Sequence, residues 1–266
     1  MTVFFSGSNQ VQRANVRGHV VLEQDDSRIQ GDEANFSGTN SVVEFTGQPS
    51  WKSGESEGHG DRLVLDRASK GMGVLGHATL KTPLQQSGMA GLAAGKVETN
   101  STASGKGFLE ISCEVYELHP GSGSFHGNVH VHGPGMAMNA NELSTRSSLP
   151  GKPKSEWAQA AGNVSADFLM NGETNHATAE LIVYDYSITN GVTNALVTLT
   201  GHPVVSNRNG DMHGDVITCD LIRNTIAFRN YGGSILLQKT NAPDLMDPFK
   251  TTKTNSATNA MNGERK

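Results

Sequence analysis

Apolar and polar residues alternate along most of the chain, and the alternation restarts at regular intervals. Glycines mark the intervals: Gly18, Gly47 and Gly76 are 29 residues apart, while Gly31 and Gly60 each follow thirteen residues after one of them. Side chains of a β-strand point to opposite faces with a period of two, so each segment is predicted to form a strand with one apolar and one polar face. Recurrence of the pattern in register predicts a regular all-β architecture built from a repeat of about 29 residues.

The same spacing returns in the second half of the chain. Gly201 and Gly214 are thirteen residues apart, and Gly127 opens another unit. Short stretches rich in Gly, Asn and Ser separate the strands, which favours sequential antiparallel pairing. Convincing amphipathic helices are absent from the pattern, although residues 154–161 could form one or two helical turns.

Three stretches interrupt the pattern. Residues 82–107 are small and polar and are predicted to form a long mobile loop, and residues 147–157, with two prolines, form a second insertion. Residues 241–266 are polar and are predicted to be a disordered tail. We therefore expect one domain over residues 1–240, although two half-domains that meet near residue 90 would also fit the pattern.

Composition excludes several classes of protein. The chain of 266 residues has a net charge of −5, whereas a nucleic-acid-binding domain is normally basic. No run of 18 apolar residues occurs, so no transmembrane helix is predicted. Two cysteines, Cys113 and Cys219, are too few for a disulfide framework or a zinc site. Cys219 lies at an apolar position of the repeat, which favours a buried free thiol over a bridge to Cys113.

Two patterns suggest ligand chemistry, but neither has the right context. The segment Gly71-Met-Gly-Val-Leu-Gly76 matches a dinucleotide-binding fingerprint, yet it runs into a predicted strand rather than a helix. His126, His130 and His132 lie at positions that the repeat assigns to the polar face. An exposed row of histidines explains them better than a metal site, which needs ligands that converge on one point.

The carboxylates at the strand ends favour a structural interpretation. Asp66, Asp185 and Asp220 each follow an alternating strand, where aspartate commonly caps a turn. Nucleophile-elbow, zinc-protease and phosphate-loop motifs do not occur in the sequence. The sequence therefore predicts a protein without catalytic residues, cofactor or metal ion.

Two parts of the chain carry a family resemblance. The segments are Gly60-Asp-Arg-Leu-Val-Leu-Asp66 with Leu75-Gly-His-Ala-Thr-Leu80, and Ala179-Glu-Leu-Ile-Val-Tyr-Asp185 with Leu199-Thr-Gly-His-Pro-Val-Val205 and Gly214-Asp-Val-Ile-Thr-Cys-Asp220. This order of strands resembles the OstA/LptA-like family of lipopolysaccharide-transport proteins, which includes the LptA and LptC types. The resemblance is clear over residues 11–81 and 176–237 and weak over residues 108–145.

The resemblance implies an elongated, open antiparallel β-jellyroll, with two twisted sheets that face each other in a V. It implies that the interior holds the lipid A acyl chains of lipopolysaccharide, as part of a periplasmic bridge to the outer membrane. It also implies that other jellyroll domains, or further copies of this chain, join by edge-strand addition. Residues 1–5 lack the basic start and the length of a signal peptide, so we expect the export signal or anchor upstream.

The apolar face provides the candidate binding site. A groove lined by it would bind lipid tails without a charged site, because burial of each methylene contributes about 0.8 kcal/mol. A core filled by its own side chains is the structural alternative. The candidate lining residues are Leu63, Leu65, Val74, Leu80, Val197, Leu199, Val205, Ile217, Ile226 and Phe228.

Two other functions fit parts of the pattern. One is a self-associating β-solenoid scaffold, which would have parallel coils around a closed, dry core. The other is a carbohydrate-active β-helix enzyme, which would need acidic or aromatic residues clustered on one exposed face. The geometry of the sheet distinguishes both from the lipid-binding jellyroll.

Overall fold

The computed structural model describes residues 2–5, 11–38, 41–90, 107–149, 151–170, 173–208, 210–223, 225–230 and 232–235. These residues form one unit, whereas residues 236–266, with the predicted tail at 241–266, lie outside the described part. The strands are β1 (Thr2–Phe5), β2 (Val11–Gln24), β3 (Ser27–Ser37), β4 (Val42–Thr46), β5 (Ser50–Ser53), β6 (Ser56–His59), β7 (Arg62–Asp66), β8 (Gly71–Pro83), β9 (Phe108–His119), β10 (Ser122–Gly133), β11 (Met136–Ser147), β12 (Ser155–Met170), β13 (Glu173–Thr189), β14 (Val192–Thr200), β15 (Val204–Asn207), β16 (Gly210–His213), β17 (Val216–Asp220), β18 (Thr225–Arg229) and β19 (Gly232–Ile235). A short 3₁₀-helix, η1 (Leu84–Gln86), follows β8.

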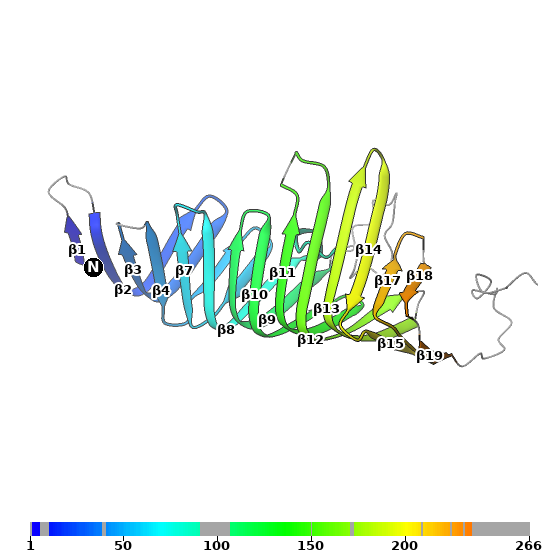
Figure 1. Ribbon diagram of the computed structural model, residues 1–266. Helices are drawn as coiled ribbons and strands as arrows, with labels where there is room; N and C mark the ends of the chain where they lie inside the picture. Colours follow the sequence, from blue (N-terminus) through cyan, green and yellow to red (C-terminus); the bar gives the residue numbers. More distant parts are fainter. Residues whose placement is uncertain are drawn as a thin grey trace, which may run out of the picture. The chain divides into compact units, whose positions relative to one another are not determined.

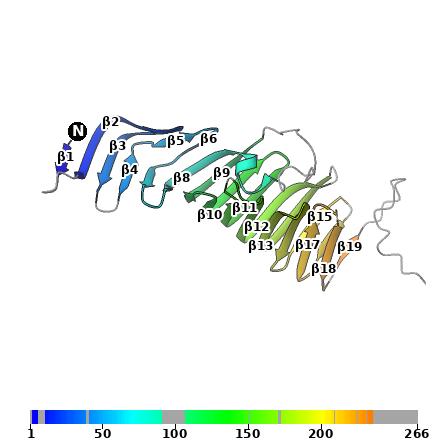
Figure 2. The same ribbon diagram turned by 90° about the horizontal axis from the view of Figure 1, so that it is seen from above.

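The strands form one hydrogen-bonded system in which neighbours largely follow chain order (Figures 1 and 2). Every pairing in the described part of the chain is antiparallel. β8 pairs directly with β9, so the sheet continues past residue 90. The structure thus confirms the predicted antiparallel β-jellyroll, and the parallel coils of the solenoid and β-helix alternatives do not occur among the described strands.

Corners divide this system into two halves. Half-sheet A contains β1, β4, β7, β14, β17 and β18, half-sheet B contains β5, β6, β15, β16 and β19, and the long strands β2, β3 and β8 to β13 run through both. The ladder register shifts where a long strand turns, as between Leu75 and Ala78 of β8. A glycine with positive φ lies at each of six such corners, and the residue after it has positive φ as well. The corner pairs are Gly18-His19, Gly47-Gln48, Gly76-His77, Gly127-Asn128, Gly162-Asn163 and Gly201-His202.

The corner at Gly76 shows why the repeat needs glycine there. Its φ is +73°, and a Cβ atom would lie 2.9 Å from the Cβ atom of Asp61 on the neighbouring segment. The amide of Asp61 donates hydrogen bonds to the carbonyls of Leu75 and Gly76. The side chain of Asp61 reaches His77, with 2.9 Å between Oδ2 and Nδ1. The Gly-His sequence of one segment and the Gly-Asp sequence of the neighbouring segment therefore contact each other at the same corner.

Two rows of interior residues cross the strands, one on each half-sheet. Row A consists of successive cross-strand partners from β2 to β18: Val16, Ala34, Phe45, Leu63, Val74, Tyr116, Phe125, Leu143, Ala160, Ile182, Leu199, Ile217 and Phe228. Row B runs from β2 to β16: Leu22, Ile29, Trp51, Gly58, Leu80, Ile111, Val131, Met138, Ala166, Ala177, Val205 and Met212. Buried members of both rows belong to one hydrophobic cluster, so the half-sheets face each other across a shared interior.

Two local predictions are wrong. Residues 154–161 form no helical turn, because β12 begins at Ser155 and pairs with β11 and β13. Asp185 does not cap a turn, because β13 continues to Thr189 before the chain reverses into β14.

Candidate functional site

The ten predicted lining residues all lie in the interior. Six of them are at most 5% exposed, Val197 is 8% exposed, and Leu65, Ile226 and Phe228 are half-buried. Leu63 faces Val74 across β7 and β8, and Leu199 faces Ile217 across β14 and β17. These residues therefore form part of one continuous apolar surface, and their contact with lipid stays a prediction.

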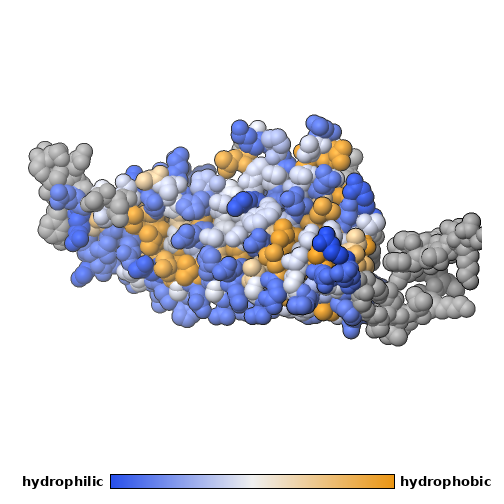
Figure 3. Space-filling view, viewed as in Figure 1, coloured by the Kyte–Doolittle hydropathy of each residue, from blue (hydrophilic) through white to orange (hydrophobic). Residues whose placement is uncertain are grey.

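The interior is closed in its middle and less buried at its ends. Row A is at most 7% exposed from Ala34 to Ile217, whereas Val16 and Phe228 at its two ends are half-buried. Row B behaves similarly, with half-buried Leu22 and Met212 at its ends. On the face seen in Figure 3, hydrophobic residues lie at the surface among hydrophilic ones. An apolar ligand therefore meets the least protected part of the interior at the ends of the rows.

One hydrogen-bonded pair crosses this interior. Trp51 of half-sheet B donates from Nε1 to the hydroxyl of Tyr116 in half-sheet A, at 2.7 Å. The same hydroxyl donates to the carbonyl of Thr79, at 3.2 Å. Tyr116 is fully buried and Trp51 is 7% exposed. Desolvation raises the pKa of Tyr116 well above its ordinary value, so the hydroxyl stays protonated and remains a donor.

A strap of residues 84–90 crosses from one half-sheet to the other. It begins where β8 ends in half-sheet B, and a Cβ atom on its Gly88 would lie 3.1 Å from the carbonyl oxygen of Arg146 in half-sheet A. Leu84 is 5% exposed and Met89 is fully buried. The start of the predicted 82–107 loop therefore packs into the hydrophobic cluster, and residues 91–106 lie outside the described part of the chain.

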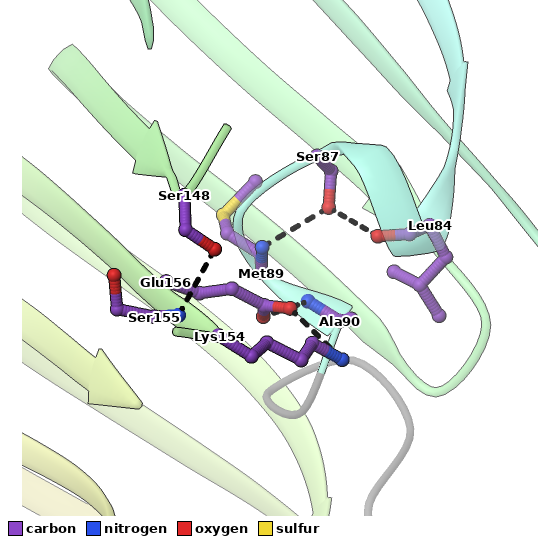
Figure 4. Close-up of polar contacts among 8 residues, drawn as sticks. All are labelled: Leu84, Ser87, Met89, Ala90, Ser148, Lys154, Ser155 and Glu156. Carbon is purple, nitrogen blue, oxygen red and sulfur yellow. Dashed lines mark hydrogen bonds and ion pairs between the residues drawn. The ribbon is translucent and has the colours of Figure 1, made fainter. Parts of the chain in front are cut away.

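Polar contacts hold the strap in place (Figure 4). The Oγ atom of Ser87 donates to the carbonyl of Leu84 at 2.7 Å and accepts the amide of Met89 at 3.1 Å. The amide of Ala90 donates to Oε2 of Glu156, at 3.2 Å. Glu156 is 4% exposed, and Lys154 approaches it to 3.5 Å. A buried carboxylate with these two partners fixes the far end of the strap to β12.

A cleft of about 880 Å³ lies on the polar outer face of half-sheet B. Outward side chains line it in a row that runs across successive strands: Arg28, Lys52, Glu57, Lys81, Glu110 and His132. The Nζ atom of Lys81 lies 4.0 Å from carboxylate oxygens of both Glu57 and Glu110. Charged side chains in ion pairs line this cleft, whereas rows A and B are apolar, so the interior is the better candidate site for a lipid.

The other sequence candidates have structural explanations. His126, His130 and His132 are exposed, as predicted, and within the described ranges no three histidine, cysteine or acidic side chains are placed to share a metal ion. Asp66 and Asp220 cap turns, as predicted: Oδ1 of Asp66 accepts the amide of Ala68 and Oδ1 of Asp220 accepts that of Arg223.

Both cysteines are free and buried, so the predicted free thiol at Cys219 is confirmed. Burial raises the pKa of the Cys113 thiol and of the Cys219 thiol to about 11 each. Both are therefore protonated near neutral pH, and the thiolate is the reactive form.

Several large interior residues were not among the sequence candidates. Tyr116 and Phe125, whose ring centroids are 5.8 Å apart, lie in the region where the family resemblance was weak. The corner between the two parts of β9 shifts the alternation, which conceals Tyr116 from a strict period-two reading. Met89 and Glu156 lie in or beside the predicted insertions, where no periodic signal exists to mark them.

The described strands define an antiparallel β-jellyroll with a continuous apolar surface in its interior. Comparison with known families agrees. Residues 114–225 match the model of the family described as LptA/(LptD N-terminal domain) LPS transport protein. This match confirms the predicted resemblance, and it includes residues 114–145 of the region in which the sequence motifs were weak.

The solved structures that are similar over part of the chain include one of a lipopolysaccharide-transport component. It is the crystal structure of LptH, the LptA-homologous periplasmic component of the conserved lipopolysaccharide transport device from Pseudomonas aeruginosa. The two chains are 15% identical, with a TM-score of 0.38, over 48% of this chain and 94% of the LptH chain. None of the curated proteins matches. Among the described residues, no helix has the length and apolar character to cross a membrane.

Proposed function

We propose that this protein carries lipopolysaccharide by holding the lipid A acyl chains between half-sheets A and B. The observation that carries the proposal is the continuity of rows A and B, which present apolar side chains from β2 to β18 and from β2 to β16. The similarity of residues 114–225 to lipopolysaccharide-transport proteins supports the same conclusion.

The energetics favour such a site. Transfer of an acyl chain from water contributes about 0.8 kcal/mol per buried methylene, without any charged group in the site. The interior side chains pack on one another in the structure, so a bound chain requires the half-sheets to separate or the side chains to rearrange. Small residues such as Ala160, Ala166 and Ala177 leave the least side-chain volume to displace.

We place the protein in the periplasm, as a non-catalytic part of a bridge to the outer membrane. β18 pairs only with β17, and β19 only with β16, among the described strands. Their free edges offer backbone groups for strand addition by another jellyroll domain or by a second copy of this chain.

Photo-crosslinking with labelled lipopolysaccharide tests the proposal. A benzophenone amino acid at Phe228 replaces a half-buried aromatic side chain on the interior face, and the control position Ala227 is exposed on the opposite face. We expect labelling at position 228 and little at position 227. A second pair, interior Leu199 and outward Thr198, extends the test to the middle of the rows.

Circular dichroism of each variant verifies that the sheet is intact. Equal labelling of both faces, or labelling of neither in a folded sample, would contradict an interior lipid path. The latter result would favour a self-associating scaffold role for the jellyroll, which needs no lipid.

A further inference from the structure

The hydrogen bond between Trp51 and Tyr116 joins the two half-sheets across their shared interior. It joins side chains that are 65 residues apart in the sequence and on opposite half-sheets. The Tyr116 hydroxyl accepts from the indole and donates to Thr79, so its donor and one acceptor site are both used. The long strands join the half-sheets at the corners, and this directional hydrogen bond fixes their separation at one point of the interior.

Gly58 makes the close approach possible. It takes the place in row B between Trp51 and Leu80, where the other described members carry side chains. A Cβ atom at Gly58 would lie 2.6 Å from Nε1 of Trp51 and 2.6 Å from the carbonyl oxygen of Thr79, and it would also meet the Tyr116 hydroxyl. The missing side chain thus provides the space in which the indole and the phenol meet.

The pair divides the interior along the direction of the rows. On one side lie Ile29 and Phe45, from β3 and β4, and on the other lies Phe125, against which the Tyr116 ring is tilted at 5.8 Å. An acyl chain has no hydrogen-bonding atoms, so it cannot replace either partner of the pair. A chain that passes between the two sides therefore has to separate the indole from the phenol and leave both buried and unpaired.

We infer that Trp51 and Tyr116 form a gate that controls passage of acyl chains from one part of the interior to the other. This inference rests on the proposed function, because a gate has no role if the interior takes up no lipid. The two residues would then control lipid movement in addition to stabilising the fold.

Tryptophan fluorescence gives a direct readout. The chain has two tryptophans, and Trp157, with Arg146 stacked on its ring at 4.8 Å, can be replaced by phenylalanine so that Trp51 is the remaining fluorophore. Lipopolysaccharide with brominated acyl chains quenches the indole when a chain reaches the gate. We expect quenching of Trp51 in this Trp157→Phe background, with a rate that rises at least threefold on Tyr116→Phe, which removes only the hydroxyl.

A second variant opens the gate without substituting either partner. Gly58→Ala inserts a methyl group between them, and we expect it to accelerate quenching as well. Gly73→Ala is the matched control, because a Cβ atom there would be 3.9 Å from its nearest neighbours. Labelling of a photoprobe at Phe228, far along row A from the gate, should be equal in all variants.

The outcomes separate the two proposals. Labelling at position 228 with a quenching rate that is unchanged by both Tyr116→Phe and Gly58→Ala would overturn the gate and leave the lipid-carrier function standing. Absence of both labelling and quenching in folded protein would overturn the function and the gate with it. Faster quenching in the two variants, with Gly73→Ala unchanged, would support the gate.

Discussion

Gly76 illustrates how a single residue sets the corner between the half-sheets. Alanine in its left-handed conformation costs about 1–2 kcal/mol, and its methyl group would also displace the Asp61 carboxylate that contacts His77. We expect Gly76→Ala to lower the free energy of unfolding by about 2–3 kcal/mol, measured by urea denaturation.

The control is Gly18→Ala at an equivalent corner. Gly18 also has positive φ, but a Cβ atom there would meet no atom within 4 Å. Only the cost of alanine in the left-handed backbone conformation remains, so we expect Gly18→Ala to lower the free energy of unfolding by about 1 kcal/mol. Equal losses at the two glycines would mean that the Asp61 contact contributes nothing to the corner.

Asp66 makes a prediction about pH. The Ser69 hydroxyl, followed by the amides of Ala68 and Ser69, lowers the pKa of its carboxyl in the folded protein. A lowered folded-state pKa adds stability above the unfolded value, near 4, and this stability is lost as the pH falls through the folded-state pKa. Asp66→Asn should therefore destabilise the protein at pH 7 and have a smaller effect at pH 3, in urea midpoints measured at both. Ser69→Ala should act in the same direction, and an effect of Asp66→Asn that is equal at both pH values would contradict this view of the cap.

Burial of single residues could be predicted from the sequence where alternation along one strand decides which face a side chain occupies. Alternation alone was enough to place Leu63, Leu199 and Ile217 in the interior, because a strand side chain has only two faces to choose from. The Trp51–Tyr116 hydrogen bond could not be predicted in this way. It depends on which strands face each other across the interior, and nothing in the local sequence of either residue encodes that distance.

At the scale of elements, the strap behaves as part of the core. Met89 is fully buried, so Met89→Ala should lower the free energy of unfolding by about 2–4 kcal/mol through lost apolar contacts and the resulting cavity. Chemical denaturation measures this effect. Leu149→Ala, at a side chain that is 49% exposed, should change it by less than about 0.5 kcal/mol. An unchanged stability of Met89→Ala would mean that the strap detaches without disturbing the sheet.

The strap and β12 also show why some elements were missed. Residues 84–90 have no periodicity, and their small polar composition is typical of a loop, yet two apolar side chains and the Glu156 contact hold them against the core. Residues 154–161 follow two prolines and contain several alanines, which favour helix when considered alone. Pairing with β11 and β13 on both sides overrides that preference.

At the scale of the whole molecule, the repeat predicted the antiparallel jellyroll because each unit supplies two strand segments and one corner.

The sheet has two open edges through which copies of the chain could assemble. β2 after its corner and β19 lie at opposite edges of half-sheet B, each paired on one side among the described strands. Backbone groups on such edges favour addition of a further strand, so head-to-tail contact between copies would extend the apolar rows from one copy to the next.

Disulfide trapping tests this assembly. A variant with cysteines at both edges, Glu23→Cys and Ser234→Cys, should form a ladder of oligomers on mild oxidation at pH 8. Either single variant should stay uncrosslinked, because in a head-to-tail contact its cysteine lies against an edge that has none. The native Cys113 and Cys219 can remain, because burial raises their pKa values to about 11 and keeps the thiols protonated at that pH. The wild-type chain should therefore give no crosslinked species. Dimers alone from the double variant, at concentrations where sedimentation shows self-association, would mean that the copies meet through like edges, and the apolar rows of more than two copies could then not be joined.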